Sequence, residues 1–318
     1  MQATRRHLLG GLAALCALGG LSRPAAAGVK EINISYVKAP FNLQSIVMRR
    51  RQLLEKEFAA DGITVTWHDL TTGPQQTQAM AAGALDIGGV LNTASVLMAN
   101  ASGNPVRIAA GVSRPARTFA ILGKAGGPAG VRDLKGKSVA GPKGTVLHQL
   151  LVAALAREGL SVSDVEFINM DLPKTQAALL AGQVDAGLLA ASLVIKSVAA
   201  GARVIATADG LVSPLLVMGV RDAFAREQPE LLARVVKVHR EAMALIEADR
   251  EAAIALGAEE QGISLEEART LAQWTNLIAV LEPTDVEAMA ADVRFLLENG
   301  MLKQPVDPKA LLLPLAMG

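Results

Sequence analysis

Residues 77–89 read Thr77-Gln78-Ala79-Met80-Ala81-Ala82-Gly83-Ala84-Leu85-Asp86-Ile87-Gly88-Gly89, and a second stretch at 175–187 repeats the pattern. The second copy begins Thr175-Gln176-Ala177 and ends Gly182-Gln183-Val184-Asp185-Ala186-Gly187, with one residue more between its Gln and its Gly. Each copy predicts a helix that ends on a left-handed glycine and is followed by a short buried strand. Two such units predict two lobes of similar build with a ligand cleft between them. Chance repetition in an alanine-rich chain is the alternative.

Around these units, apolar runs of strand length alternate with helical patterns. Strands are predicted at 31–37, 63–68, 85–90, 106–112, 119–122, 138–141, 165–170, 184–189, 203–206 and 215–220. Helices are predicted at 42–58, 74–82, 93–102, 145–158, 173–181, 192–200, 229–247, 250–261, 264–274 and 284–298. This order predicts an α/β fold in which each lobe is a mostly parallel sheet flanked by helices. Crossings near 113–116 and 209–214 divide the chain into lobe 1 (28–113 with 214–318) and lobe 2 (114–213), and the C-terminal helices are expected to brace lobe 1.

The first 27 residues have the pattern of an export signal. Arg5 and Arg6 precede an apolar run, and Ala25-Ala26-Ala27 offers a small-residue cleavage site, so the mature chain is expected to begin near Gly28 in the periplasm. The arginine pair resembles a twin-arginine signal, with an ordinary secretory signal as the alternative. Cys16, the only cysteine, lies within this segment. The mature chain therefore has no disulfide, thiolate metal site or cysteine nucleophile.

Charge and composition favour a soluble exported protein. Three of the 31 Lys and Arg residues lie in 1–27 and none of the 30 Asp and Glu residues does, which leaves 28 against 30 and a net charge of −2. This balance gives no electrostatic reason to expect nucleic acid as a partner. No later stretch is long and apolar enough to span a bilayer. The sequence has no cofactor or metal motif, so none is expected, and a monomer is predicted.

Candidate ligand contacts lie at glycine-flanked helix starts. Thr145 follows Gly144 at a helix start, where free backbone N–H groups and the helix dipole can hold an anion, or where Thr145 is a plain N-cap. Thr72-Gly73-Pro74-Gln75 is a similar start in lobe 1, either a turn before a proline-initiated helix or a place where the Thr72 hydroxyl and the amides of Gly73 and Gln75 face the cleft. Asn92 and Thr93 follow a strand at its carboxyl end, where open α/β sheets bind ligands; a simple cap is the alternative.

Four other residues complete the candidate set. Phe41 and Asn42 stand between a strand and a helix, and Asn42 is expected to cap that helix or to contact the ligand. Arg114, in the first crossing, either pairs with an oxyanion or is a surface charge at the hinge. His148, one turn into its helix, is either a packed residue or a ligand contact.

Several of these motifs resemble the solute-binding proteins of ABC importers, with the type II sulfonate, taurine and nitrate group as the nearest branch. The resemblance rests on 131–140, on Lys143-Gly144-Thr145, on the Gly182–Ala186 block, and in lobe 1 on Phe41-Asn42, Thr72-Gly73-Pro74 and 82–88. It covers roughly residues 30–220. The family commonly continues with tryptophans and an Asp-Pro-Tyr end after Asp-Ala, whereas 186–192 reads Ala-Gly-Leu-Leu-Ala-Ala-Ser.

The resemblance implies a two-lobed periplasmic-binding-protein fold that closes around a small anionic solute, such as an alkanesulfonate or taurine, and delivers it to an ABC permease in the inner membrane. Nitrate, a phosphonate or a pyrimidine precursor is the alternative solute. An exported, lyase-like enzyme acting on a small carboxylated substrate is the alternative class. The histidines show no ligand spacing and no nucleophile motif is present, so no catalytic residue is expected.

Overall fold

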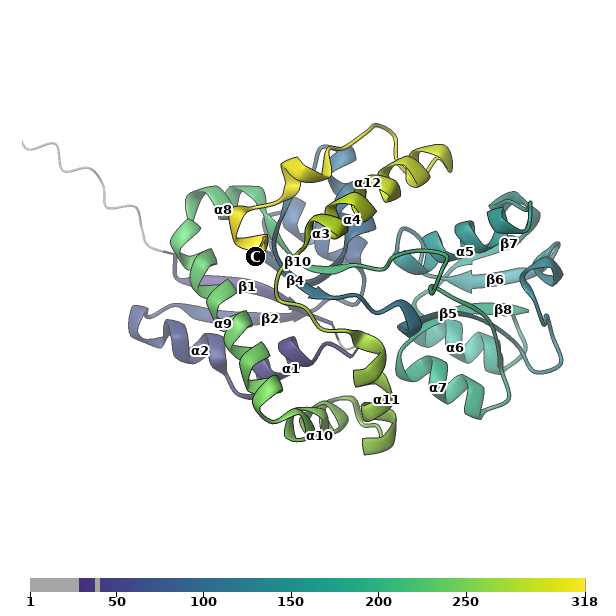
Figure 1. Ribbon diagram of the computed structural model, residues 1–318, viewed down its shortest axis with the longest axis horizontal. Helices are drawn as coiled ribbons and strands as arrows, with labels where there is room; N and C mark the ends of the chain where they lie inside the picture. Colours follow the sequence, from purple (N-terminus) through teal and green to yellow (C-terminus); the bar gives the residue numbers. More distant parts are fainter. Residues whose placement is uncertain (1–28, 38–40, 318) are drawn as a thin grey trace, which may run out of the picture.

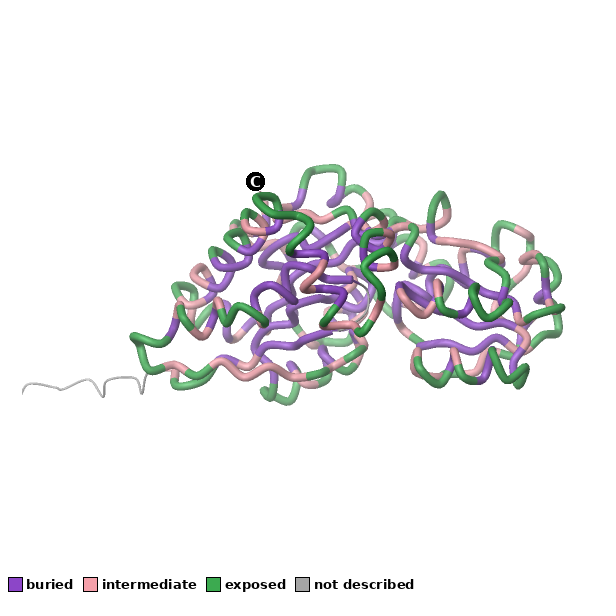
Figure 2. The backbone as a smooth tube through the Cα atoms, turned by 90° about the horizontal axis from the view of Figure 1, so that it is seen from below, coloured by how far each residue is buried: buried purple, intermediate pink, exposed green. Residues whose placement is uncertain are grey.

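The computed structural model describes residues 29–37 and 41–317, so the predicted export signal lies outside the described residues. The described chain forms two bodies, each built on its own five-stranded sheet, with helices on both faces (Figure 1). In each body the central strands are buried and the helices expose their outer faces (Figure 2). The prediction of a two-lobed α/β fold is confirmed.

Lobe 1 has the strand order β2-β1-β3-β10-β4. Its first three strands are parallel, and β10 runs antiparallel to both β3 and β4. The strands are β1 (Glu31–Tyr36), β2 (Thr64–Asp69), β3 (Ile87–Asn92), β4 (Val106–Ser113) and β10 (Leu216–Arg221).

Lobe 2 has the order β7-β6-β8-β5-β9, in which β7, β6 and β8 are parallel and β5 runs antiparallel to β8 and β9. Its strands are β5 (Phe119–Gly123), β6 (Ser138–Gly141), β7 (Glu166–Asn169), β8 (Ala186–Ala190) and β9 (Arg203–Thr207). The two sheets therefore share one plan, because in each the antiparallel fourth strand is the one that follows a crossing from the other lobe.

The repeated sequence unit occupies the same place in both lobes. In lobe 1, α3 (Gly73–Ala81) ends before Gly83 at φ +73° and leads into β3. In lobe 2, α6 (Leu172–Leu180) ends before Gly182 at φ +71° and leads into β8. A positive φ is strained for residues with a Cβ atom but not for glycine. Both copies therefore end their helices in the way the sequence predicts.

Helices cover both faces of the lobe 1 sheet. One face packs on α3, α4 (Thr93–Ala101) and α12 (Pro283–Glu298) through a cluster that includes Met80, Leu97 and Met289. The other face packs on α1 (Leu43–Arg50) and α9 (Pro229–Ala248), with α2 (Leu53–Phe58), α8 (Asp222–Glu227) and α10 (Arg250–Gln261) beside them (Figure 1). The C-terminal helices thus brace lobe 1, although α11 (Leu265–Thr275) also touches α7 (Ser192–Ala199) of lobe 2.

Lobe 2 follows the same layering, with α5 (Val146–Arg157) on one face of its sheet and α6 and α7 (Ser192–Ala199) on the other (Figure 1). Short 3₁₀ turns join the elements of both lobes; they span Ala59–Asp61, Ala116–Thr118, Val131–Leu134, Val162–Asp164, Pro308–Leu311 and Pro314–Ala316. No helix in the described ranges is both long and apolar enough to cross a bilayer.

One helix prediction was wrong. The segment 42–58 forms two helices rather than one, because Gln52 takes a left-handed conformation at φ 53° between them. Arg49 and Arg50 then pair with Glu260 of α10, which fastens α1 to the C-terminal helices. Both arginine side chains are partly exposed, so they are structural partners at the surface of the protein.

The lobes are joined by the chain between β4 and β5 and between β9 and β10. They also touch directly: the Ser95 hydroxyl of α4 donates to the Gly144 carbonyl of lobe 2 at 3.1 Å. We retain 28–113 with 214–318 and 114–213 as the proposed lobe limits.

Candidate functional site

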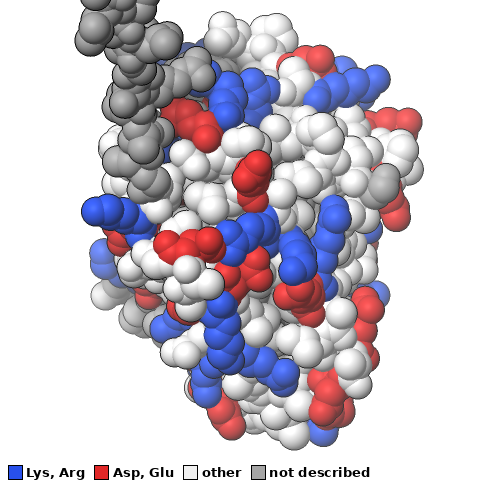
Figure 3. All heavy atoms as spheres, turned by 90° about the vertical axis from the view of Figure 1, so that its left-hand side faces the viewer, with Lys and Arg blue, Asp and Glu red and all other residues white. Residues whose placement is uncertain are grey.

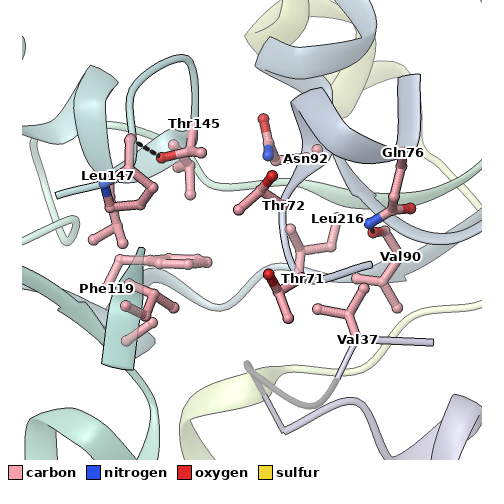
Figure 4. Close-up of a pocket in the computed structure, with 15 residues that line it drawn as sticks. Val37, Thr71, Thr72, Gln76, Val90, Asn92, Phe119, Thr145, Leu147 and Leu216 are labelled. Atoms are coloured by element: carbon pink, nitrogen blue, oxygen red, sulfur yellow. Dashed lines mark hydrogen bonds between the residues drawn. The ribbon is translucent and has the colours of Figure 1, made fainter. Parts of the chain in front are cut away.

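A cavity lies between the two lobes, at the carboxyl ends of the parallel strands of both sheets (Figure 4). It offers roughly 60 Å³ to the centre of a water-sized molecule, enough for a few waters or for part of a small solute. Lobe 1 contributes Val37, Thr71, Thr72, Gly73, Gln76, Val90, Asn92 and Leu216; lobe 2 contributes Phe119, Pro142, Thr145, Val146, Leu147, Leu172 and Ala190.

The start of α5 is the main polar feature of the lobe 2 wall. Thr145 does not cap this helix, because its hydroxyl donates to the Pro142 carbonyl at 2.8 Å instead. The first N–H groups of an α-helix have no acceptor within the helix, and here no side chain supplies one. Thr145, Val146 and Leu147 all line the cavity, so this uncapped turn brings main-chain donors and the positive end of the helix dipole to the space. The interpretation of Thr145 as a plain side-chain N-cap was wrong.

The helix starts on the lobe 1 wall are capped by their own side chains. Thr72 accepts a hydrogen bond from the Gln75 amide, and the Gln75 side chain accepts one from the Thr72 amide, which forms a capping box. Because the cap occupies the Gln75 amide, the expectation that this N–H faces the cleft was wrong, and Gln75 is not among the lining residues. Gly73 does line the cavity, packed so closely on α4 that a Cβ there would overlap the Ser95 hydroxyl.

Asn92 caps α4 with its side-chain oxygen, which accepts from the Ser95 amide at 2.8 Å. Its side-chain amide nitrogen is left as a donor at the cavity wall (Figure 4). Thr93, the next candidate, is buried, does not line the cavity, and donates its backbone N–H to the Leu215 carbonyl.

Most of the rest of the wall is apolar, with Thr71 and Gln76 as its other polar residues. Phe119, Leu147, Val37 and Leu216 surround the space between the polar helix starts (Figure 4), and Leu172 also lines it. None of the described lining residues carries a charged side chain. The site therefore suits a small molecule with one anionic end, held by neutral donors, and an apolar remainder.

Phe41 and Asn42 belong to the core of lobe 1. Phe41 is fully buried, and its ring lies so close to Gly257 of α10 that a Cβ there would overlap it. The Asn42 side chain donates to the Val37 carbonyl at 3.2 Å and does not cap α1. Neither residue lines the cavity.

Arg114 is turned away from the cavity. Its guanidinium makes two hydrogen bonds to Asp285 of α12, at 2.7 and 2.6 Å, and lies 3.3 Å from Glu282. These carboxylates raise the pKa of Arg114 above its ordinary value, against the effect of partial burial. Arg114 is thus a structural ion pair at the crossing, and the structure does not bring it to the predicted ligand site.

Gly144 and His148 line a neighbouring hollow rather than the main cavity. His148 stacks on Phe167 with ring centroids 4.8 Å apart, and burial together with the nearby charge of Lys143 lowers its pKa to about 4. Gly144 takes φ +72° and lets its loop approach Pro74 of lobe 1. No group of three His, Cys, Asp or Glu side chains within 29–37 and 41–317 is arranged to hold a metal ion.

Sequence reasoning missed several lining residues. Gln76 is fixed by hydrogen bonds from the Ser35 hydroxyl and to the Val90 carbonyl. Phe119 and Leu216 begin the strands that follow the two crossings, and Ala190 ends β8. Asn92 was predicted because open α/β sheets bind ligands at the carboxyl ends of their strands. Val37 and Ala190 also lie at strand ends, so the same argument could have found them. The apolar side chains looked like core.

Comparison with known proteins points to one family. A protein of Escherichia coli (strain K12) that is inferred to bind aliphatic sulfonates is 26% identical over 257 residues, which is 79% of this chain and 78% of that protein. The taurine-binding periplasmic protein of the same organism is 26% identical over 189 residues, 55% of each chain. The alkanesulfonate-binding protein SsuA from Xanthomonas axonopodis pv. citri, solved bound to MOPS, superposes with a TM-score of 0.80 at 26% identity and covers 91% of this chain and 99% of its own.

The fold is not confined to binding proteins. The desulfurization enzyme DSZB shares it with a TM-score of 0.66 at 16% identity, over 90% of this chain and 96% of that one, and this likeness concerns the fold alone. The family model described as NMT1/THI5 like matches residues 58–253, more than half of the sequence. This chain belongs to the NMT1/THI5-like family.

Proposed function

We propose that this chain is the solute-binding component of an ABC importer and that its two lobes close around a small aliphatic sulfonate. The observation that carries the proposal is the uncapped start of α5 at the inter-lobe cavity, opposite apolar side chains. A sulfonate group stays ionised at ordinary pH, and its oxygens can accept several main-chain hydrogen bonds. The names of the relatives, which include alkanesulfonate and taurine binders, agree with this chemistry.

The cavity wall favours an uncharged alkyl chain over taurine. Taurine carries an ammonium group, and burying that group without a carboxylate partner is costly. The described lining residues include no Asp or Glu, but they include Phe119, Leu147 and Leu172, which can cover a short alkyl chain. We therefore propose that the protein prefers alkanesulfonates to taurine. Of the residues that the sequence predicted as ligand contacts, we propose that Thr72, Gly73, Asn92 and Thr145 hold the solute.

We also propose that the protein binds its solute without transforming it, acts in the periplasm after cleavage near Ala27, is monomeric and docks on an inner-membrane permease. We propose that it has no nucleic-acid partner. On the end face of lobe 1, Lys and Arg are interspersed with Asp and Glu, so this face has no large positively charged patch (Figure 3). Because the same fold also occurs in an enzyme, an enzyme that transforms its solute is the second candidate.

The test is isothermal titration of the mature chain, in a buffer free of sulfonates, with hexanesulfonate, taurine, hexanoate and nitrate. We expect hexanesulfonate to bind most tightly and to raise the thermal midpoint, because a ligand of the folded state stabilises it. Binding of nitrate or hexanoate alone would reject the sulfonate proposal. Recovery of chemically altered hexanesulfonate after long incubation would favour the enzyme.

A further inference from the structure

A buried hydrogen bond joins the two lobes next to the cavity. The Gln149 side chain of α5 donates to the Asp292 carboxylate of α12 at 2.7 Å, and both side chains are buried, with 3% and 9% of their surface exposed. Gln149 lies on the same helix as the uncapped turn, and Asp292 lies on a C-terminal helix of lobe 1. The contact therefore exists only while the lobes are together.

Asp292 has no cationic partner among the described residues. Its carboxylate forms no ion pair in the structure, in contrast to Asp285 on the same helix, which is held by Arg114. Burying a carboxylate with one neutral donor disfavours its charged form. Burial accordingly raises the pKa of Asp292 to about 6, against the lowering effect of the Gln149 hydrogen bond.

The other titratable groups on the elements around Asp292 do not change its pKa. The third helix at the junction, α4, has none along Thr93–Ala101. Helix α5 carries His148 and Arg157, and Asp307 and Lys309 lie at the adjoining 3₁₀ turn. The titratable residues of α12, apart from Asp292, are Asp285, Glu287, Arg294 and Glu298. None of these groups shifts the pKa of Asp292. The His148 ring stacks on Phe167 of its own lobe, but the hollow that it lines also includes Met98 and Met301 of lobe 1. Burial disfavours protonated His148, so in acid this residue acts against the effect of Asp292.

We propose that Gln149 and Asp292 form a proton-linked latch, in which closing the lobes buries the Asp292 carboxyl and takes up a proton. The inference rests on the proposed function, because closure is read out through solute binding. A group that holds its proton more strongly in the closed form favours that form as the pH falls. Protonation of Asp292 should thus strengthen solute binding as the pH falls from 7 to 5, and should leave it level above neutrality.

The size of the effect follows from the two states of the carboxyl. If the Asp292 carboxyl has an ordinary pKa while the lobes are open, its protonation on closure raises the solute affinity about tenfold between pH 7.5 and pH 5. A sulfonate does not titrate in this range, so the dependence belongs to the protein.

The experiment is titration of the mature protein with hexanesulfonate at pH 5.0, 6.0 and 7.5, in acetate and bis-Tris, neither of which carries a sulfonate. Between pH 7.5 and pH 5.0, we expect the affinity of wild type and of the matched control Glu287→Gln, an exposed charge on the same helix, to change about tenfold more in favour of binding than that of Asp292→Asn. Asp292→Asn keeps an acceptor for Gln149 but cannot ionise, and should lose the gain. Any pH dependence left in Asp292→Asn measures His148 and other groups.

Asp292→Asn with the same pH gain as wild type would overturn the latch. Gln149→Leu supplies a second test, since loss of its hydrogen bond should move the pH gain to higher pH; an unchanged profile would also contradict the proposal. Hexanesulfonate binding with the same pH dependence in wild type and Asp292→Asn rejects only the latch. No binding at any pH, with a folded protein by thermal melting, rejects the proposed function instead.

Discussion

Asp86 and Asp185 occupy equivalent places in the two lobes. Asp86 accepts a hydrogen bond from the Asn33 amide of β1 at 3.0 Å, and Asp185 accepts one from the Ser138 amide of β6 at 3.1 Å. Each also pairs with a cation at the end of the antiparallel strand: Asp86 with Arg221 at 2.7 Å and Asp185 with Lys124 at 2.8 Å. The aspartate of the repeated motif therefore ties three strands together in each sheet.

Replacing these aspartates should weaken the two lobes unequally. Asp86→Ala leaves the Asn33 amide and the Arg221 guanidinium without this acceptor in a mostly buried site and should cost about 2–3 kcal/mol. Asp185→Ala affects a more exposed pair and should cost about 1 kcal/mol. Urea denaturation measures both, with Asp86→Asn separating charge from hydrogen bonding. Equal losses would show that the burial difference is unimportant.

The Arg114–Asp285 pair should support stability rather than ligand binding. Burial raises the pKa of Asp285, but hydrogen bonds from Arg114 and the Glu282 amide outweigh this and hold it below its usual value. A carboxyl with a lowered pKa stabilises the fold above its unfolded pKa, near 4, and loses that contribution as the pH falls through the folded value. Arg114→Ala should therefore cost about 1–2 kcal/mol at pH 6 and much less at pH 3. A cost that is constant with pH in denaturation curves would contradict this assignment.

His239 should make the protein sensitive to acid. Its ring is fully buried against the Gly111 carbonyl, and burial lowers its pKa to about 4. Since the unfolded chain binds a proton near pH 6.5, stability is lost as the pH falls from 6.5 to 4, by on the order of 3 kcal/mol. His239→Gln removes the titrating group, so the difference in unfolding free energy between variant and wild type should shift in favour of the variant across this range. A difference that does not change with pH would count against it.

Thr145 tests the ligand site itself. Thr145→Leu places a larger apolar side chain beside the α5 amides and removes the bond to Pro142, so hexanesulfonate affinity should fall at least about tenfold. Thr145→Ser keeps the hydroxyl and should bind within about threefold of wild type. Titration of both, with thermal melting to check folding, gives the comparison. Normal binding by Thr145→Leu would move the site elsewhere.

Much of the fold could be predicted because its signals are local. Gly83 and Gly182 end their helices at positive φ, and the alternation of strands and helices needs no long-range information. The direction of β5 and β10 depends on the crossings, which apolar patterning does not encode. The break at Gln52 has no sequence signal, since a left-handed glutamine is unusual.

Residues that line the cavity were predicted only where local pattern and sheet geometry agreed. Thr72, Asn92 and Thr145 follow strand ends and begin helices, which placed them at the cavity. Arg114 was misjudged because its partner Asp285 lies 171 residues away, and an ion pair of that range leaves no trace in the sequence. Leu147 and Phe119 were missed because apolar residues at a cavity wall have the same periodicity as core residues.

The most direct test of the central claim is a crystal structure of the mature protein with hexanesulfonate. We expect the sulfonate oxygens within hydrogen-bond distance of the Val146 and Leu147 amides, between the two sheets, and the alkyl chain against Phe119 and Leu172. A sulfonate bound anywhere else, or an empty inter-lobe cavity at saturating ligand, would contradict the account.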